Sequence, residues 1–451
     1  MPINIIGSMV VQGPEVLPGW QYIKSYGPLL AVIGGLKYYC RGTTNTWERD
    51  LHGKVYIITG GTSGLGAALV DDLAARGAQL ILLVRSIEDA WLTEYIQDLR
   101  DKHSNFLIYA EECDLSSLYS VRKFATKWLD NSPPRRLDGV VCTAAEALPY
   151  GKERENSIDG LEIQTAVNYV GHYHLLTLLS PSLRAQIPDR DVRVILTTCL
   201  SQAMGNLDLK DPLFIAKRYP KNKPWTVYGT SKLQLGLFAK EFQRRLLAVP
   251  RKDGSPLNVR VNVVNPGFMR SPSTKRVLSF GSLFGLFLYL VYLPILWVFL
   301  KSSAQGIQSI LYALMCPDFI NLDGGNFISE CDIYKPARAE FEDAELQKNL
   351  FDATEKFISE VEKDSAYKRK KAEAIAKKSK ETKDKKEKES NAKSNDNSKE
   401  DIGLKTNSQP KGEVPLFPEL DKDGNIKSSK PAATNNSKSK NNKKGKKGKK
   451  T

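Results

Sequence analysis

Cysteine and histidine are scarce in this chain, and neither residue type is grouped. Its 451 residues include 6 cysteines and 4 histidines, and no two cysteines form a Cys-x-x-Cys pair. This spacing argues against a disulfide framework and against a metal site built from these residues. The composition fits a reduced body that faces the cytosol.

Acidic residues are too few to balance the basic ones at the C-terminal end. Residues 362–451 contain 27 Lys and Arg against 14 Asp and Glu, so they carry +13 of the chain's net +15. The first 361 residues are nearly neutral. Because the tail has few apolar residues to bury, we predict that 362–451 is disordered. Such a tail could bind anionic lipid or RNA, but a nucleic-acid partner is not the one that we expect.

Residues 1–47 lack a small-residue cleavage signature, so this region does not resemble a signal peptide. It contains the apolar stretch 26–36, flanked by the basic residues Lys24, Lys37 and Arg41. The uncharged core is too short to cross a bilayer easily. We therefore predict a membrane anchor that either lies in the interface or spans marginally.

Between about residues 53 and 335, apolar β-rich runs alternate with amphipathic helical segments. The apolar runs are 54–59, 79–84, 106–111, 137–143, 192–198, 258–264 and 325–329. This alternation predicts an α/β fold, a Rossmann-type doubly wound parallel sheet. We place this domain at residues 48–345 and a helical extension at 346–361.

A glycine-rich segment follows the first apolar run. Residues 59–66 have the sequence Thr-Gly-Gly-Thr-Ser-Gly-Leu-Gly, which predicts the end of a strand, a tight turn and the start of a helix. Glycines suit this place because a dinucleotide pyrophosphate must come close to the backbone and rest on the helix N-terminus.

A second motif, Tyr-Gly-Thr-Ser-Lys, begins at Tyr228. A helix would bring the phenol of Tyr228 and the ammonium of Lys232 to one face. An amphipathic stretch follows, and then the apolar run 258–264. The two motifs in this order predict a protein that moves a hydride and a proton to or from a carbonyl group.

With these motifs, the chain resembles the short-chain dehydrogenase/reductase family, and in particular its retinol-dehydrogenase-like, membrane-associated branch. The resemblance covers about residues 53–335. Further stretches that support it are Cys113–Ser117, Asp159–Glu162, Asn168–His172, Asn265–Gly267 and Gly324–Phe327.

This resemblance implies which residues bind a dinucleotide. Asp114 would bind the adenine edge. The pyrophosphate turn would consist of Gly60, Ser63, Gly64, Leu65 and Gly66. The other cofactor-binding residues would be Leu115, Ala144, Asn168, Tyr228, Lys232, Pro266 and Gly267.

Arg85 bears on the choice between NAD and NADP. It directly follows the apolar run 79–84, near a place where family members that prefer NAD usually carry an acid for the ribose hydroxyls. A guanidinium suits a 2′-phosphate instead. We therefore expect the cofactor to be NADP(H).

The resemblance also implies the catalytic roles. Tyr228 would be the acid/base, Lys232 would also hold the nicotinamide ribose, and Asn168 would order a water that leads to Lys232. A free phenol, with a pKa of about 10, is mostly protonated at neutral pH. The positive charges of Lys232 and of the nicotinamide would favour its ionised form.

Two positions depart from the family pattern. Cys199 stands at the place of the catalytic serine, and its thiol is a weaker hydrogen-bond donor than a hydroxyl. Ser201 would substitute for it only if the following turn brings Ser201 inward. Residues 142–145 are Cys-Thr-Ala-Ala where the family has Asn-Asn-Ala-Gly, which affects the loop that braces the nicotinamide.

The segment 277–300 contains no charged residue and is long enough to cross a bilayer. A single crossing would separate the last helix and strand from the rest of the sheet. We therefore predict a monotopic insertion, broken near Pro294 and near Gly281 and Gly285, that returns to the side it left. The basic residues expected at the headgroups are Lys275, Arg276 and Lys301.

Together these features predict a membrane-associated, NADP(H)-dependent oxidoreductase that interconverts a carbonyl and an alcohol. The expected substrate is lipophilic, such as a lipid, sterol or retinoid, and the expected place is the cytosolic face of the endoplasmic reticulum or a lipid droplet. One alternative is a catalytically impaired nucleotide-binding scaffold at a membrane. Another is a binder of RNA or anionic lipid through the basic tail. Whether the chain forms homo-oligomers stays open.

Overall fold

The body is built on one sheet of eight strands in the order β3-β2-β1-β4-β5-β6-β7-β8. The computed structural model describes residues 13–16, 19–251 and 253–394. Pairing is parallel from β3 through β7, and β8 runs antiparallel to β7. The strands are β1 Val55–Thr59, β2 Gln79–Val84, β3 Ile108–Glu112, β4 Gly139–Cys142, β5 Val192–Thr197, β6 Val259–Asn265, β7 Phe327–Ser329 and β8 Asp332–Tyr334. The predicted α/β Rossmann-type sheet is confirmed.

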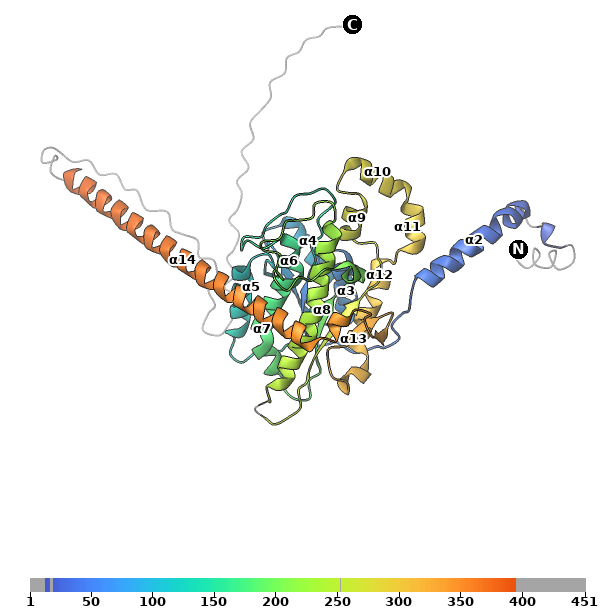
Figure 1. The fold of residues 1–451 in the computed structure, drawn as a ribbon, viewed down its shortest axis with the longest axis horizontal. Helices are drawn as coiled ribbons and strands as arrows, with labels where there is room; N and C mark the ends of the chain where they lie inside the picture. Colours follow the sequence, from blue (N-terminus) through green and yellow to red (C-terminus); the bar gives the residue numbers. More distant parts are fainter. Residues whose placement is uncertain (1–12, 17–18, 252, 395–451) are drawn as a thin grey trace, which may run out of the picture. The chain divides into compact units, whose positions relative to one another are not determined.

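Helices cover both faces of this sheet (Figure 1). One face carries α3 (Gly64–Ala75), α4 (Ala90–His103) and α13 (Gln308–Met315). The other carries α5 (Leu118–Leu129), α7 (Gly171–Arg184) and α8 (Pro224–Ala248). Successive residues of a strand point to opposite faces, so Ile57 and Ile58 enter different buried clusters. Burial on both faces explains why the central strands are rich in apolar residues.

Seven of the eight strands coincide with the predicted apolar runs, and β8 was not predicted. β7 and β8 form a hairpin whose two connecting residues, Glu330 and Cys331, both have positive φ values, 54° and 56°. Glycine, asparagine and aspartate are the usual residues in such a turn. A three-residue strand after a Glu-Cys turn therefore carries little sequence signal.

The uncharged segment 277–300 forms short helices rather than one long one. These are α9 (Pro272–Leu278), α10 (Leu283–Val291) and α11 (Leu293–Phe299). The chain turns at Phe280 and Gly281, which have positive φ values, and again at Tyr292, shortly before Pro294. Gly285 lies within α10 and does not break it, because the Ser282 hydroxyl caps its backbone N–H.

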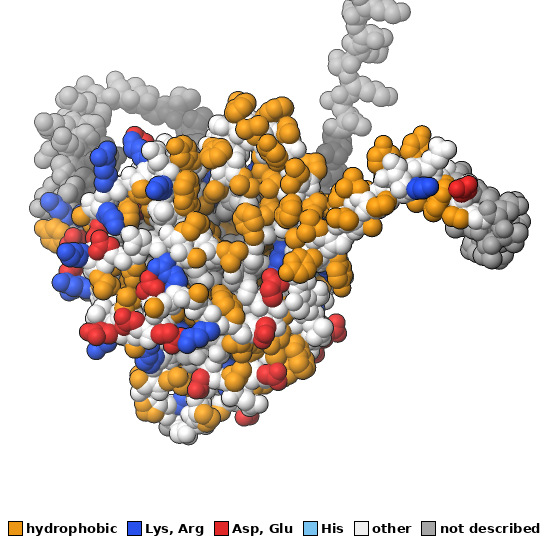
Figure 2. All heavy atoms as spheres, turned by 45° about the vertical axis from the view of Figure 1, so that its right-hand side comes forward, with side chains coloured by type: hydrophobic (Ala, Val, Ile, Leu, Met, Phe, Trp, Pro, Cys, Tyr) orange, Lys and Arg blue, Asp and Glu red, His pale blue; other side chains and the backbone are white. Residues whose placement is uncertain are grey.

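Among the described residues, no single helix combines the length and the hydropathy needed to cross a bilayer. The helices α9 and α10 would pass that test only as a pair, and they are bent by 108° relative to each other. Figure 2 shows hydrophobic side chains gathered on the surface over this part of the chain.

Lys301 does not lie where we predicted it, in a row of basic residues at lipid headgroups. Its side chain is buried, and its ammonium pairs with Glu330 in the β7–β8 turn. Its backbone forms an isolated bridge with Met269, which follows β6. The chain has therefore already returned to the sheet at Lys301, and Lys275 and Arg276 remain exposed.

The N-terminal region contains the helix α2 (Trp20–Cys40), none of whose residues is buried. At the other end, α14 runs from Ala344 to Ser394. Residues 395–451 lie outside the described part of the chain, where the predicted disorder stays a prediction. The predicted tail overlaps α14 over residues 362–394. This stretch is rich in Ala, Lys and Glu, which favour helix and form stabilising pairs one turn apart.

The described residues also form several short helices. They are η1 Pro14–Val16, α6 Ile163–Thr165, the π-helical turn η2 Ala166–Val170, η3 Leu200–Met204, α12 Ser303–Gly306, η4 Pro317–Ile320 and η5 Ala339–Phe341.

Candidate active site

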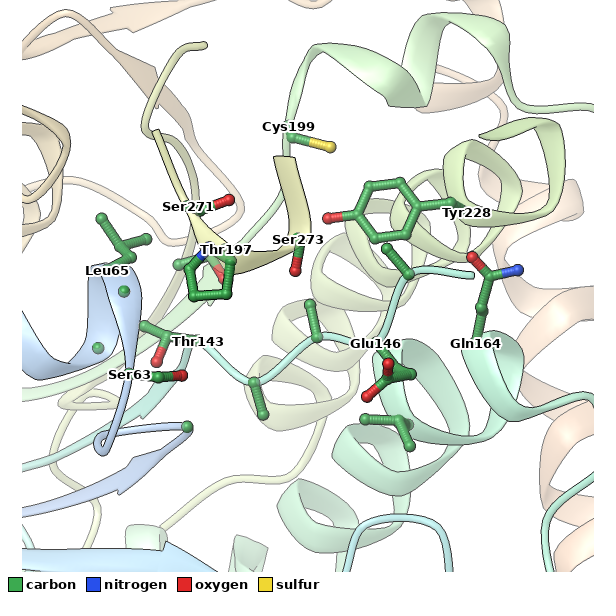
Figure 3. A pocket seen from close by; sticks show the side chains of 18 of the residues that line it. Ser63, Leu65, Thr143, Glu146, Gln164, Thr197, Cys199, Tyr228, Ser271 and Ser273 are labelled. Atoms are coloured by element: carbon green, nitrogen blue, oxygen red, sulfur yellow. The ribbon is translucent and has the colours of Figure 1, made fainter. Parts of the chain in front are cut away.

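A cavity of about 1050 Å³ opens at the carboxyl ends of the parallel strands. This edge of an open α/β sheet is where ligands usually bind. Figure 3 shows side chains from separate segments meeting in the cavity, among them Ser63, Thr143, Cys199 and Tyr228. Every residue predicted for cofactor binding or catalysis lines it, with the exception of Asn168.

The glycine turn between β1 and α3 lies at one end of the cavity. Gly60 has a φ of 68°, and a Cβ atom there would lie 2.7 Å from the Cα of Ala144. A Cβ atom on Gly66 would collide with the carbonyl oxygen of Gly60. Side chains at these two positions would push apart the turn and the loop after β4. The turn can therefore bring backbone N–H groups close to a pyrophosphate.

Arg85 and Asp114 line the adjoining part of the cavity, after β2 and β3. Arg85 is exposed and makes no ion pair with any residue that the structure describes. Asp114 is fixed, because its carboxylate accepts hydrogen bonds from the backbone N–H and the hydroxyl of Ser116, at 2.9 and 2.8 Å. A free cation and an oriented carboxylate at this end suit the adenosine half of a dinucleotide.

The altered loop at residues 142–145 is held by threonines. The Thr143 hydroxyl donates to the carbonyl oxygen of Thr59 at 2.5 Å, and the N–H of Ala144 donates to the Thr59 hydroxyl at 3.2 Å. These bonds tie the end of β4 to the end of β1. The loop is thus braced although it lacks the side-chain amides that the family pattern led us to expect.

Tyr228 and Lys232 lie one turn apart on α8, and both line the cavity. The Lys232 Nζ lies 5.9 Å from the centre of the Tyr228 ring and donates a 3.1 Å hydrogen bond to the carbonyl oxygen of Thr197. Burial lowers the pKa of Lys232. Burial, and then the nearby Cys199 thiol, raises the pKa of Tyr228 well above its usual value. In the protein alone, the Tyr228 hydroxyl is therefore protonated at neutral pH.

Cys199 and Ser201 form a pair beside Tyr228. Cys199 begins the turn η3, and its Sγ lies 2.6 Å from the Ser201 Oγ. Both residues line the cavity, so the turn does bring Ser201 inward. The Thr198 hydroxyl is engaged elsewhere, since it donates to the Gln202 side chain at 2.8 Å. A thiol and a hydroxyl in contact with each other therefore line the cavity beside Tyr228.

Asn168 is fully buried in the π-helical turn η2 and does not line the cavity. Its carboxamide accepts from the backbone N–H of Glu146 at 2.7 Å, and donates to the carbonyl oxygen of Glu146 at 2.9 Å and to the Ser231 hydroxyl at 3.0 Å. The side chain therefore clamps the loop after β4 to helix α8, a role that our sequence analysis missed. A π turn of this kind often marks a functional site.

The part of the cavity beyond Tyr228 is mostly apolar and was only outlined by the sequence. Glu146 and Arg276 form an ion pair there, which joins the loop after β4 to α9. Sequence spacing gave no sign of this pair, because its members lie far apart in the chain. Other lining residues in this part are Leu148, Ile163, Val167, Met204, Trp225, Phe268, Val277 and Leu278.

The chain is similar to known proteins over most of its length. A family model described as short chain dehydrogenase matches residues 54–204. An uncharacterized oxidoreductase of Saccharomyces cerevisiae is 48% identical over 82% of this chain and 95% of its own length. Retinol dehydrogenase 13 of Mus musculus is 31% identical over 72% of this chain and 91% of its own length.

A solved structure also matches the fold. An uncharacterized protein from Mycobacterium paratuberculosis has a TM-score of 0.51 and 25% sequence identity to this chain. The match covers 70% of this chain and 98% of that protein.

Proposed function

The chain belongs to the short-chain dehydrogenase family, and from this premise we propose that it is an NADP(H)-dependent oxidoreductase that interconverts a carbonyl and an alcohol on a lipophilic substrate. The observation that carries the proposal is the meeting of Tyr228, Lys232 and the glycine turn in one cavity. A bound nicotinamide would supply a hydride to the carbonyl carbon, or take it from the alcohol carbon.

The chain's own residues handle the proton. In reduction, the Tyr228 hydroxyl donates its proton to the substrate oxygen as the hydride reaches the carbon. In oxidation, the Tyr228 phenolate accepts the alcohol proton. The charge of Lys232, one turn away, stabilises this phenolate, and the Cys199 and Ser201 pair donates a hydrogen bond to the substrate oxygen. Asn168 keeps the loop after β4 in place beside them.

The preference for NADP(H) rests on Arg85. Its guanidinium borders the cavity after β2 and has no carboxylate partner among the described residues. A planar guanidinium can bind a 2′-phosphate with two parallel hydrogen bonds. This is the place at which an acidic residue would instead bind the ribose hydroxyls of NAD.

A lipophilic substrate is favoured by the apolar side chains beyond Tyr228, and by the continuation of α9 into an apolar surface. We propose that the protein works at a membrane on its cytosolic side, in the endoplasmic reticulum or at lipid droplets. The free cysteines fit a reducing compartment.

The test is turnover by the purified protein with NADPH or NADH and a panel of lipophilic aldehydes and ketones. We expect NADPH consumption with at least one of them, and none by the Tyr228→Phe variant, which should still bind NADPH within a few-fold. Full activity in Tyr228→Phe would refute the proton transfer.

A nucleotide-binding scaffold without catalysis is the second candidate, and Cys199 at the serine position favours it. NADPH binding without turnover on any member of the panel, and without gain on Cys199→Ser, would support the scaffold over the enzyme. The further alternative, binding of RNA or anionic lipid by the basic tail, mostly concerns residues outside the described part of the chain.

A further inference from the structure

Two helical segments far apart in the sequence expose large apolar side chains. On α2 they include Tyr26, Leu29, Leu30 and Val32, and on α10 they include Leu283, Phe284, Phe287 and Leu290. Leu283 is 88% exposed and Phe284 is 70% exposed. Such side chains are costly to leave in water when they are contiguous, and large patches of this kind mark binding surfaces. Figure 2 shows hydrophobic side chains gathered on the surface over both segments.

Lys37 joins α2 to α11, the helix that follows α10. Its ammonium donates to the carbonyl oxygens of Trp297 and Leu300, at 2.7 and 3.2 Å, where α11 ends. It also lies 5.0 Å from the centre of the Trp297 ring. Carbonyl groups at a helix C-terminus attract a cation because they lack partners within the helix. This clasp holds α2 against α11, so α2, α10 and α11 present one apolar surface.

The two stretches of sequence that contain these helices have no acidic residue of their own. No Asp or Glu occurs between Glu15 and Glu48 or between Asp253 and Asp318, although both stretches contain basic residues. Lys275 is exposed beside the apolar helices. Phosphate groups of lipids would complement these cations, and lipid tails would cover the apolar side chains.

We propose that α2, α10 and α11 together form a docking surface for one leaflet of a phospholipid bilayer, a step that rests on the membrane location proposed above. The helices α10 and α11, with 9 and 7 residues, are far shorter than the roughly 20 residues of a span, so they lie in the interface. Val277 and Leu278 line the cavity just before α10 begins. A lipid substrate therefore passes from the leaflet along α9 into the cavity.

The proposal is tested by flotation of the full-length protein with phosphatidylcholine vesicles at about 0.5 M salt, where attraction between the basic tail and lipid is screened. Two double variants remove one half of the surface each: Phe284→Asp with Phe287→Asp, and Leu30→Asp with Val32→Asp. Either should lower the ratio of vesicle-bound to free protein at least about tenfold. Lys37→Met, which breaks the clasp, should lower the ratio by less.

Ile187→Asp is the matched control, because Ile187 is also exposed but precedes β5, at the opposite end of the strands from the cavity. It should float like the native protein. Undiminished flotation of the α10 variant would overturn the proposal. The proposal would also be overturned if that variant changed from an oligomer to a monomer while its flotation stayed unaltered, because the surface would then bind a second copy of this chain. Turnover of a water-soluble aldehyde is measured on the same samples. A loss of turnover would count against the proposed reaction, whereas a loss of flotation alone concerns only the membrane surface.

Discussion

At the scale of single residues, the protonation of Tyr228 leads to a prediction about the direction of the proposed reaction. Burial, and then Cys199, raises its pKa, so the phenol is the stable form at neutral pH. In the proposed mechanism, reduction uses the phenol and oxidation uses the phenolate. We expect the rate of carbonyl reduction to be nearly constant from about pH 6 to 8, and the rate of alcohol oxidation to rise through this range, by up to tenfold for each pH unit. Rate profiles in both directions would show this, and an oxidation rate that peaks in acid would contradict it.

The Cys199 and Ser201 pair leads to a graded prediction. Their contact at 2.6 Å places a thiol and a hydroxyl where the family pattern has one hydroxyl. Cys199→Ser should keep or raise kcat, because it restores the stronger donor. Ser201→Ala should lower kcat by about two- to tenfold, the usual value of one hydrogen bond. If Cys199→Ala and Ser201→Ala both turn over like the native enzyme, the pair only packs.

Arg85 permits a test of cofactor choice. Replacing it by aspartate removes the phosphate partner and introduces an acceptor for ribose hydroxyls. A charge-assisted hydrogen bond contributes about 1.5–3 kcal/mol, so Arg85→Asp should weaken NADPH binding by about ten- to a hundredfold and strengthen NADH binding. Titration of intrinsic protein fluorescence with each nucleotide measures both constants. Unchanged affinity for NADPH would exclude Arg85 from the phosphate site.

At the scale of helices and strands, the sequence predicted the elements that a pattern of neighbouring residues identifies. β1 and β2 consist mostly of apolar residues because both of their faces are buried. β8 was missed because its turn uses Glu330 and Cys331 in conformations that other residues normally adopt. Contacts between residues far apart in the sequence could not be predicted either, such as those of Arg276 with Glu146 and of Lys37 with the end of α11. Residues within one motif could be predicted, whereas pairs that only the folded topology brings together could not.

The helix α14 is attached to the body by a charged contact. Arg122 on α5 holds the Glu362 carboxylate, and His174 on α7 lies 3.2 Å from it. Burial alone would raise the pKa of Glu362, but the contacts with His174 and Arg122 together outweigh it and lower this pKa to about 2. Because this pKa is depressed, the contact stabilises the fold above the unfolded-state pKa of about 4.3, and the gain is lost as the pH falls toward 2.

Glu362→Gln should therefore lower the free energy of unfolding by about 1–3 kcal/mol at pH 7. The difference from the native protein should shrink as the pH falls below about 4.3. Denaturant titrations at several pH values measure it, with Glu360→Gln as the control, since Glu360 is exposed on the same helix. A difference that does not depend on pH would assign the effect to packing rather than to charge.

At the scale of the whole molecule, the cavity draws its walls from connections after six strands, β1 to β6. A nucleotide that binds there would contact only the folded chain, and it would stabilise that state by mass action. At a concentration of one hundred times Kd, the gain is about 2.7 kcal/mol, which corresponds to a rise of several degrees in Tm. We expect NADPH to raise Tm more than NADH at equal concentration, and Arg85→Asp to reduce the NADPH effect. The same samples help to distinguish the enzyme from the scaffold, because a rise in Tm without turnover, and without a gain on Cys199→Ser, favours the scaffold. No rise with either nucleotide would refute both, since each requires the cavity to hold a dinucleotide.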